Sequence, residues 1–123
     1  MVYLFIFVLS GVGALLRFFL SVKFNASGFP WGTLSVNVIG SVALGCFVFF
    51  ASQKHYFISK DMHLAMCVGL FGGLTTFSTF SFELFDMIQN HKLLMAGSYV
   101  MASVVGSLLL VFISFGVLQR TFS

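Results

Sequence analysis

A run of hydroxyl side chains lies in one of the most apolar parts of the chain. Five of the seven residues from Thr75 to Ser81 are threonine or serine. An α-helix turns by about 100° per residue, so Thr76, Thr79 and Glu83 share one helical face on which hydroxyls lead toward a carboxylate. Hydroxyl groups donate hydrogen bonds, and a row of them in an apolar helix suits the binding of a small polar ligand or ion.

Polar residues recur at four-residue steps in two other apolar segments. A single hydroxyl in an apolar helix usually hydrogen-bonds a carbonyl group of its own helix. Three aligned rows, in contrast, predict the lining of a narrow pathway. One of the further rows contains Thr33, Asn37, Ser41 and Gly45, and the other contains Tyr99, Ser103 and Ser107, with Ser114 close to the same line.

The chemistry that these rows favour is binding rather than catalysis. No histidine, cysteine or acidic pair lies within the apolar segments at a spacing that suits metal binding or acid–base catalysis. Glu83 and Asp86 are three residues apart near the end of their segment. The serines have no histidine and aspartate companions of the kind that activate a nucleophile. We therefore predict that the protein is not an enzyme.

A small anion fits the predicted pathway. Carboxylates are absent from its middle, and hydroxyl, amide and phenol groups donate hydrogen bonds to anions. Phe77 and Phe80 fall on one helical face together with Leu84, and the edge of a phenyl ring carries partial positive charge. Most of the 18 phenylalanines are expected to be packing residues, but these two lie within the hydroxyl run and can present ring edges to a dehydrated anion.

The composition indicates that lipid surrounds most of the protein. The 123 residues are 59% hydrophobic and 7% charged, with a mean hydropathy of +1.09, whereas about a quarter of the residues of a soluble domain are charged. The length allows a single membrane domain, residues 1–123. The net charge of +3 includes no basic cluster, so we expect no nucleic acid partner. Cys46 and Cys67 are interpreted as apolar packing residues.

Four segments are long and apolar enough to cross a bilayer as α-helices. A hydrocarbon core of about 30 Å needs roughly 20 mostly apolar residues. Short connections join the segments, so we predict an all-α integral membrane protein with four transmembrane helices per subunit. The predicted spans are about Tyr3–Val22, Gly32–Ser52, Met62–Ile88 and Leu93–Leu118.

The positive charges near the span ends show almost no bias between the two sides of the membrane. Lysine and arginine near span ends favour the cytoplasm, but the count is three against three, or three against two without Arg17. We therefore predict insertion in both orientations and pairing with an inverted copy, as an antiparallel dual-topology homodimer. The small residues Gly40, Ser41 and Gly45 suit close helix contacts in such an assembly. The two sets are Lys54, Lys60 and Arg120, and Lys23, Lys92 and Arg17.

The third predicted span is expected to break at the midplane of the membrane. Paired glycines at 72–73 remove side-chain support, and Thr75 and Thr76 follow with stiff β-branched side chains. A break frees backbone N–H and C=O groups that lipid cannot satisfy, so they must meet protein, water or an ion. The alternative is that the glycines only let another helix pack closely, but five nearby hydroxyls exceed what packing requires.

Three stretches of the chain resemble a known family, the Fluc or CrcB family of bacterial fluoride channels. The stretch "GGLTTFSTF" at 72–80 resembles the family signature. The stretches "GVGALLRF" at 11–18 and "GTLSVNVIGS" at 32–41 are similar to its first-span and second-span patterns. The matches cover nearly the whole chain, and departures are mild: Phe18 stands where tyrosine is common and Phe71 where cysteine is common.

The resemblance implies a fluoride-selective channel that exports fluoride passively across the bacterial plasma (inner) membrane. It also implies an antiparallel homodimer of four-span subunits with two fluoride pores, and a structural Na⁺ on the two-fold axis. The carbonyl groups of Gly72 and Thr75 from both subunits would hold this ion. The residues that the resemblance assigns to the fluoride pathway are Phe77, Phe80, Asn37, Ser78, Thr79, Tyr99, Ser103, Glu83 and Arg17.

Helical spacing does not independently support the assignments of Ser78 and Arg17. Helical projection places Ser78 away from both of the faces described above, so its assignment depends on the resemblance alone. Arg17 would make an aqueous vestibule attractive to anions, but a snorkelling membrane anchor explains it equally well.

Two other classes of function stay open on sequence grounds. A dual-topology small multidrug-type cation exporter would also have four short spans, but it needs a buried carboxylate, and no acidic residue lies in the first or second span. A small membrane subunit with a purely structural role would co-purify with a partner in fixed ratio.

Overall fold

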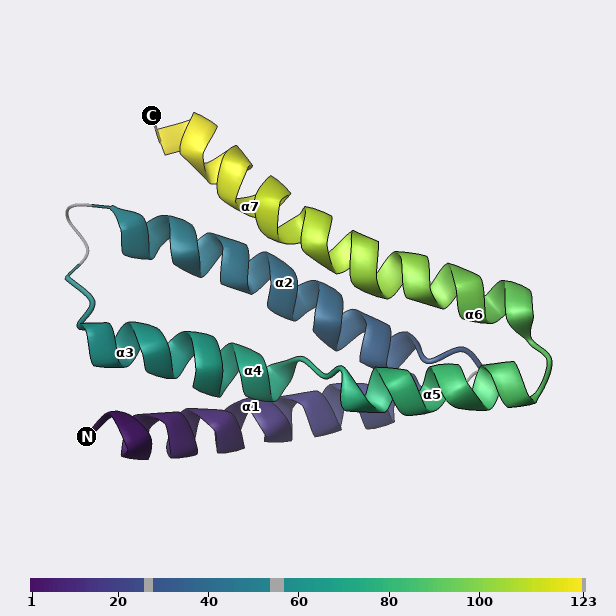
Figure 1. Cartoon of the computed structure of the whole chain (residues 1–123). Helices are drawn as coiled ribbons and strands as arrows, with labels where there is room; N and C mark the ends of the chain where they lie inside the picture. Colours follow the sequence, from purple (N-terminus) through teal and green to yellow (C-terminus); the bar gives the residue numbers. More distant parts are fainter. Residues whose placement is uncertain (26–27, 54–56, 123) are drawn as a thin grey trace.

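The regular structure of the computed structural model is entirely helical in the residues that it describes, which are 1–25, 28–53 and 57–122 (Figure 1). The π-helical segments η1 and η2 interrupt the third and fourth long helices. In chain order the elements are α1 (Val2–Phe24), α2 (Trp31–Ser52), α3 (Lys60–Leu64), η1 (Ala65–Phe71), α4 (Gly72–Leu74), α5 (Ser78–Gln89), α6 (Leu93–Val100), η2 (Met101–Gly106) and α7 (Ser107–Phe122).

The described part of the chain contains four long apolar helical segments, as predicted. Their mean hydropathies lie between 1.4 and 2.4, and each segment is long enough to cross a membrane. This confirms the expectation of an all-helical protein with four segments capable of spanning a bilayer. Lys54, which belongs to the predicted count of positive charges, lies outside the described residues. The four segments are Val2–Phe24, Trp31–Ser52, Lys60–Gln89 and Leu93–Phe122.

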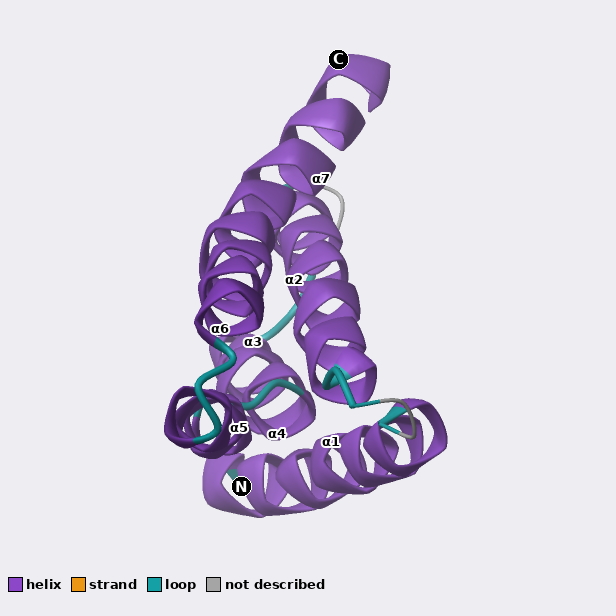
Figure 2. Cartoon of the chain, turned by 90° about the vertical axis from the view of Figure 1, so that its right-hand side faces the viewer, coloured by secondary structure: helices purple, strands orange, loops and turns teal. Residues whose placement is uncertain are grey.

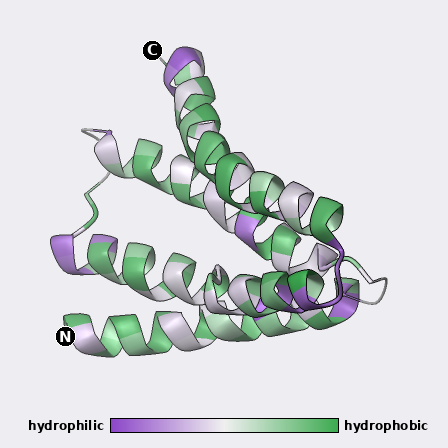
Figure 3. Ribbon diagram, turned by 45° about the vertical axis from the view of Figure 1, so that its right-hand side comes forward, coloured by the Kyte–Doolittle hydropathy of each residue, from purple (hydrophilic) through white to green (hydrophobic). Residues whose placement is uncertain are grey.

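Hydrophobic residues occupy most of the length of the helices, whereas hydrophilic residues gather mainly near helix ends (Figure 3). Phe7 on α1 is 78% exposed and Phe112 on α7 is 69% exposed. An exposed apolar surface on this scale is unusual for a soluble domain and suits helices that contact lipid.

Glycines let the helices approach closely. A Cβ atom on Gly13 of α1 would lie 2.7 Å from the backbone nitrogen of Leu74, and one on Gly73 of α4 would lie 2.6 Å from the carbonyl oxygen of Ser10. No side chain fits at such distances, so α1 packs backbone against backbone on η1 and α4 (Figure 1). Gly73 is helical, and its lack of a side chain allows this close packing. Close packing is the alternative that the sequence left open for the paired glycines.

The second long helix packs mainly against the fourth. α2 and α7 make extensive contact, and Figure 2 shows α6 and α7 beside α2, away from α1. Gly45 of α2 contacts Ser114 and Val111 of α7, and Gly40 contacts the side chain of Thr75. Two of the small residues that were expected to suit contacts in an assembly thus make close contacts within one chain.

Candidate functional site

Helical structure stops between Leu74 and Ser78. Thr75 has an extended backbone with ψ of 158°, and Thr76 and Phe77 also lie outside the helices. The backbone N–H and the hydroxyl group of Thr75 both donate to the carbonyl oxygen of Phe71, at 3.0 and 2.8 Å. This three-residue interruption between α4 and α5 is the centre of the candidate site.

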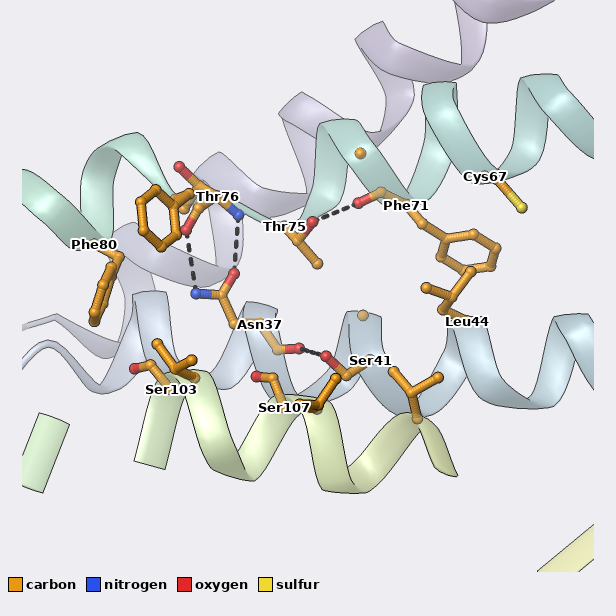
Figure 4. Close-up of a pocket in the computed structure, with 16 residues that line it drawn as sticks. Asn37, Ser41, Leu44, Cys67, Phe71, Thr75, Thr76, Phe80, Ser103 and Ser107 are labelled. Atoms are coloured by element: carbon orange, nitrogen blue, oxygen red, sulfur yellow. Dashed lines mark hydrogen bonds between the residues drawn. The ribbon is translucent and has the colours of Figure 1, made fainter. Parts of the chain in front are cut away.

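Asn37 on α2 pairs with the backbone of Thr76 in both directions (Figure 4). The N–H of Thr76 donates to Asn37 Oδ1 at 2.9 Å, and Asn37 Nδ2 donates to the carbonyl oxygen of Thr76 at 3.2 Å. A side-chain amide has one donor end and one acceptor end, so it can satisfy both backbone groups of one residue. Asn37 therefore replaces the helical hydrogen bonds that Thr76 lacks.

The hydroxyl group of Thr76 caps the start of α5. It accepts a hydrogen bond from the backbone N–H of Thr79 at 3.2 Å and donates to Thr79 Oγ1 at 3.2 Å. Ser78 Oγ lies 3.4 Å from the same hydroxyl. An acceptor at this place satisfies one of the free N–H groups at a helix start. The predicted residues Ser78 and Thr79 thus belong to a local hydroxyl cluster, and both are exposed.

Two carbonyl groups at the interruption accept no hydrogen bond from the described part of the chain. Of the residues that the structure describes, none has a backbone N–H that donates to the carbonyl oxygen of Gly72 or Thr75. Both residues line the same cavity. Freed carbonyl oxygens of interrupted membrane helices are suitable ligands for Na⁺. The donor chemistry at these two positions therefore fits the ion that the resemblance implies.

A cavity of about 460 Å³ lies beside the interruption. Figure 4 shows α2 on one side of it and the interruption on the other. The predicted site residues that line it are Asn37, Gly72, Thr75, Phe77, Phe80 and Ser103. The predicted residues Ser78, Thr79, Glu83, Tyr99 and Arg17 are not among its described lining residues.

The hydroxyls of the predicted rows fall into two groups. Ser41 Oγ donates to the carbonyl oxygen of Asn37 at 2.7 Å, and Ser114 Oγ donates to that of Leu110 at 2.7 Å. These two serines only bond their own helices. In contrast, the hydroxyl oxygens of Ser103 and Ser107 are buried and make no hydrogen bond within the described part of the chain. Both residues line the cavity, where a buried unpaired hydroxyl is costly unless a ligand or water meets it.

Three aromatic rings continue from the interruption toward α6. The ring centroids of Phe77 and Phe80 are 5.4 Å apart, and those of Phe80 and Tyr99 are 5.0 Å apart. Phe80 is only 4% exposed, whereas Phe77 is 73% exposed. The two predicted pathway phenylalanines thus have very different surroundings within one chain.

Glu83 on α5 joins three helices through its carboxylate. Thr33 of α2 donates to Oε1 at 2.8 Å, and the Tyr99 hydroxyl of α6 donates to Oε2 at 2.6 Å. Asn25, at the end of α1, donates to Oε1 through Nδ2 at 3.3 Å. The side chains of Thr33 and Tyr99 are fully buried. Hydrogen bonds to a charged acceptor are stronger than neutral ones, so this cluster fixes α2, α5 and α6 relative to one another.

A second, smaller cavity of about 170 Å³ reaches Glu83 from the end of the bundle, between the first connection and the α5–α6 turn. Its polar lining residues are Asn25, Glu83, Asp86 and Lys92. Glu83 therefore lies between this cavity and the buried hydroxyls of Thr33 and Tyr99.

The sequence prediction did not assign several residues that the structure places in this region. Thr33 belonged to the predicted row on α2 but not to the predicted site. Thr76 was placed in the hydroxyl run, although its capping role depends on where the helix stops. Asn25 had no periodic signal, because it follows the last turn of α1. The predicted residue Arg17 lies half-buried on α1 and lines neither cavity.

Comparison with known proteins gives a consistent assignment. The family model described as CrcB-like protein, Camphor Resistance (CrcB), matches residues 4–116. A protein of Phocaeicola vulgatus named fluoride-specific ion channel FluC is 38% identical over 105 residues, which cover 83% of this chain and 85% of that protein. The protein of the same name from Pectobacterium atrosepticum is 40% identical over 113 residues, with 89% and 87% covered.

A third relative with this name, from Bordetella pertussis, is 42% identical over 98 residues, which cover 79% of this chain and 75% of that protein. The residues that the family model matches, 4–116, include the interruption between α4 and α5. The chain belongs to the CrcB family.

Proposed function

We propose that the chain is a fluoride-selective ion channel, which lets fluoride leave a bacterial cell passively across the plasma membrane. The observation that carries the proposal is the interruption between α4 and α5, where hydrogen-bond donors meet a cavity in an apolar protein. The relatives that match most of the chain have fluoride-specific ion channel as their name. The protein acts as a conduit and not as an enzyme.

The cavity has the chemistry that a small anion needs. Its described lining residues are all uncharged, so no carboxylate repels an anion there. The unpaired hydroxyls of Ser103 and Ser107 can donate to an ion that has lost water. Phe80 lines the cavity with a buried ring, and the positive edge of a phenyl ring adds a weak attraction.

The hydroxyls around Glu83 extend this pathway toward the end of the bundle. Tyr99 and Thr33 donate to the carboxylate, and a hydroxyl can rotate to donate to another acceptor instead. An anion that passes Ser103 would meet these donors next. Arg17 would attract anions toward a wider aqueous vestibule, and Ser78 and Thr79 would add hydroxyls at the start of α5.

We further propose that the working unit is an antiparallel homodimer of dual topology, with the interruption at the midplane of the membrane. The near balance of positive charges between the two sides supports both orientations. Gly72 and the ring of Phe77 are exposed in one chain although both line the cavity. A second, inverted copy would cover this face and form a two-fold interface of the kind that inverted repeats make in transporters.

The same interface would hold a structural Na⁺. The carbonyl oxygens of Gly72 and Thr75, from each subunit, are its proposed ligands, since they accept no hydrogen bond from the described residues. When bound, the ion would coordinate the freed carbonyl groups, which lipid cannot satisfy, and add positive charge near the anion pathway.

Fluoride efflux from liposomes tests the proposal. The purified protein would be reconstituted into vesicles that contain fluoride, with a potassium ionophore to balance charge, and efflux would be followed with a fluoride electrode. We expect rapid protein-dependent efflux of fluoride and retention of chloride in matched vesicles. Equal release of both anions, or no release, would refute the proposal. An organic cation that drives a pH change in the vesicles would instead support an exporter.

A further inference from the structure

Asn25 connects three elements that the proposed pathway uses. Its backbone N–H donates to the carbonyl oxygen of Ser21 at 3.0 Å and ends α1. Its side-chain oxygen Oδ1 accepts from the backbone N–H groups of Gly32 at 2.7 Å and Thr33 at 3.4 Å, at the start of α2. Its side-chain nitrogen Nδ2 donates to Glu83 Oε1 of α5 at 3.3 Å.

The acceptor end of this amide has a plain structural role. The first N–H groups of a helix have no partner within the helix, and asparagine and aspartate are among the best side chains for satisfying them. Asn25 caps α2 from the end of the preceding helix. The close approach depends on Gly32, because a Cβ atom there would lie 2.6 Å from the Cα atom of Ser21 and 2.7 Å from Asn25 Oδ1.

The donor end of the Asn25 amide, Nδ2, bonds the Glu83 carboxylate, and helix capping does not require this hydrogen bond. Glu83 Oε1 accepts from both Asn25 and the hydroxyl group of Thr33. Asn25 also holds the backbone N–H of Thr33. One side chain therefore fixes both partners of the Thr33–Glu83 hydrogen bond, and Glu83 in turn receives the Tyr99 hydroxyl on its other oxygen.

Asn25, Thr33 and Glu83, which are joined by these hydrogen bonds, lie near the end of the helix bundle, beside the smaller cavity. Asn25 and Glu83 both line the smaller cavity of about 170 Å³, together with Asp86 and Lys92. Glu83 lines that cavity and also accepts from the buried hydroxyls of Thr33 and Tyr99, so its carboxylate lies between the cavity and these hydroxyls. The direction in which the carboxylate points therefore decides whether these hydroxyls are aligned along the pathway.

We propose that Asn25 is a positioning residue of the ion pathway, which holds the Glu83 carboxylate toward Thr33 and Tyr99 by donating from Nδ2. The proposal depends on the proposed channel function. It assigns to Asn25 no direct contact with the ion. A capping role alone would need only Oδ1, so the two roles can be separated by a variant that keeps this oxygen and loses the donor.

The variant Asn25→Asp makes that separation. It keeps an oxygen that can cap α2 but replaces the donor with a carboxylate oxygen beside Glu83, where like charges repel. The matched control is Asn90→Asp, because Asn90, just after the end of α5, donates from Nδ2 to Asp86 Oδ1 at 3.2 Å in a similar amide–carboxylate pair. Both variants add one negative charge near the same end of the bundle.

Fluoride efflux would be measured for the wild type and both variants from pH 6 to 8, with background from protein-free vesicles subtracted. We expect Asn25→Asp to conduct about tenfold more slowly than the wild type at pH 8, since a charge-assisted hydrogen bond is lost. Asp86, Lys92 and Tyr99 are the other titratable groups around Glu83, and the wild-type and Asn90→Asp profiles record their contribution.

The outcomes separate this proposal from the channel function itself. If Asn25→Asp assembles like the wild type and conducts equally at every pH, the positioning role is refuted while the channel function stands. If the wild type does not conduct fluoride, both fail. Should Asn25→Asp not assemble, Asn25→Ala decides the question, because it removes the donor without adding charge. An assembled Asn25→Ala with wild-type efflux would overturn the proposal. Because this variant also removes the capping oxygen, a several-fold loss supports the proposal only if the free energy of unfolding is unchanged, and a loss that accompanies destabilisation would count for capping alone.

Discussion

The pairing of Asn37 with Thr76 predicts that Asn37→Ala destabilises the folded protein strongly. The substitution removes both partners of the Thr76 backbone, the acceptor at 2.9 Å from its N–H and the donor at 3.2 Å from its carbonyl oxygen. Thr76 is only 7% exposed, so water reaches these groups poorly. Each buried group left unpaired costs about 1–3 kcal/mol.

The expected loss in the free energy of unfolding is therefore about 2–4 kcal/mol, toward the lower end of the sum because the neighbouring cavity can admit some water. Unfolding in detergent micelles can be followed by the fluorescence of Trp31, the single tryptophan, which begins α2. The matched control is Asn90→Ala. Asn90 also donates twice, to the carbonyl oxygen and the carboxylate of Asp86 at 2.8 and 3.2 Å, but it is exposed.

We expect Asn90→Ala to change the free energy of unfolding by less than about 0.5 kcal/mol, as exposed surface substitutions usually do. Equal stabilities of the Asn37→Ala and Asn90→Ala variants would refute the reasoning. In that case the interruption between α4 and α5 would not depend on the amide of Asn37.

Three further predictions concern conduction. Phe80→Ile should lower fluoride efflux while leaving the dimer intact in size-exclusion chromatography, because it removes the ring edge but keeps apolar volume; unchanged efflux would count against the ring. Ser103→Ala should slow efflux about tenfold, through loss of one hydrogen bond to an ion, without loss of stability, since its hydroxyl is unpaired in the folded protein; a destabilised variant would show that the hydroxyl has a structural partner instead. Replacement of Na⁺ by a large organic cation should slow conduction, and full activity after prolonged Na⁺ removal would argue against the carbonyl site at Gly72 and Thr75.

The presence of four long helices was predictable because apolar length is a direct signal. A run of about 20 apolar residues has few alternatives to a spanning helix, and short connections leave little else to assign. The break was predicted for the stretch of paired glycines and threonines at 72–76, and the glycines themselves do not interrupt the helix. Gly72 and Gly73 are helical, and Gly73 packs against Ser10. The non-helical residues are Thr75, Thr76 and Phe77, just after them.

The rows of hydroxyls were predictable as rows, but the state of each hydroxyl was not. Helical spacing places Ser41 and Ser103 on polar faces alike, whereas only the fold decides that Ser41 bonds its own helix and Ser103 stays unpaired. The pairing of Asn37 with Thr76 joins residues 39 positions apart, and no local pattern encodes it. Asn25 had no signal for a similar reason, because its partners lie on α2 and α5.

The central claim is selective conduction of fluoride, and the most direct test is the reversal potential of the purified protein in a planar bilayer with fluoride on one side and chloride on the other. We predict a current whose reversal potential follows the fluoride gradient and does not move when chloride is exchanged for a large anion. A reversal potential that follows chloride or the cations would contradict the account.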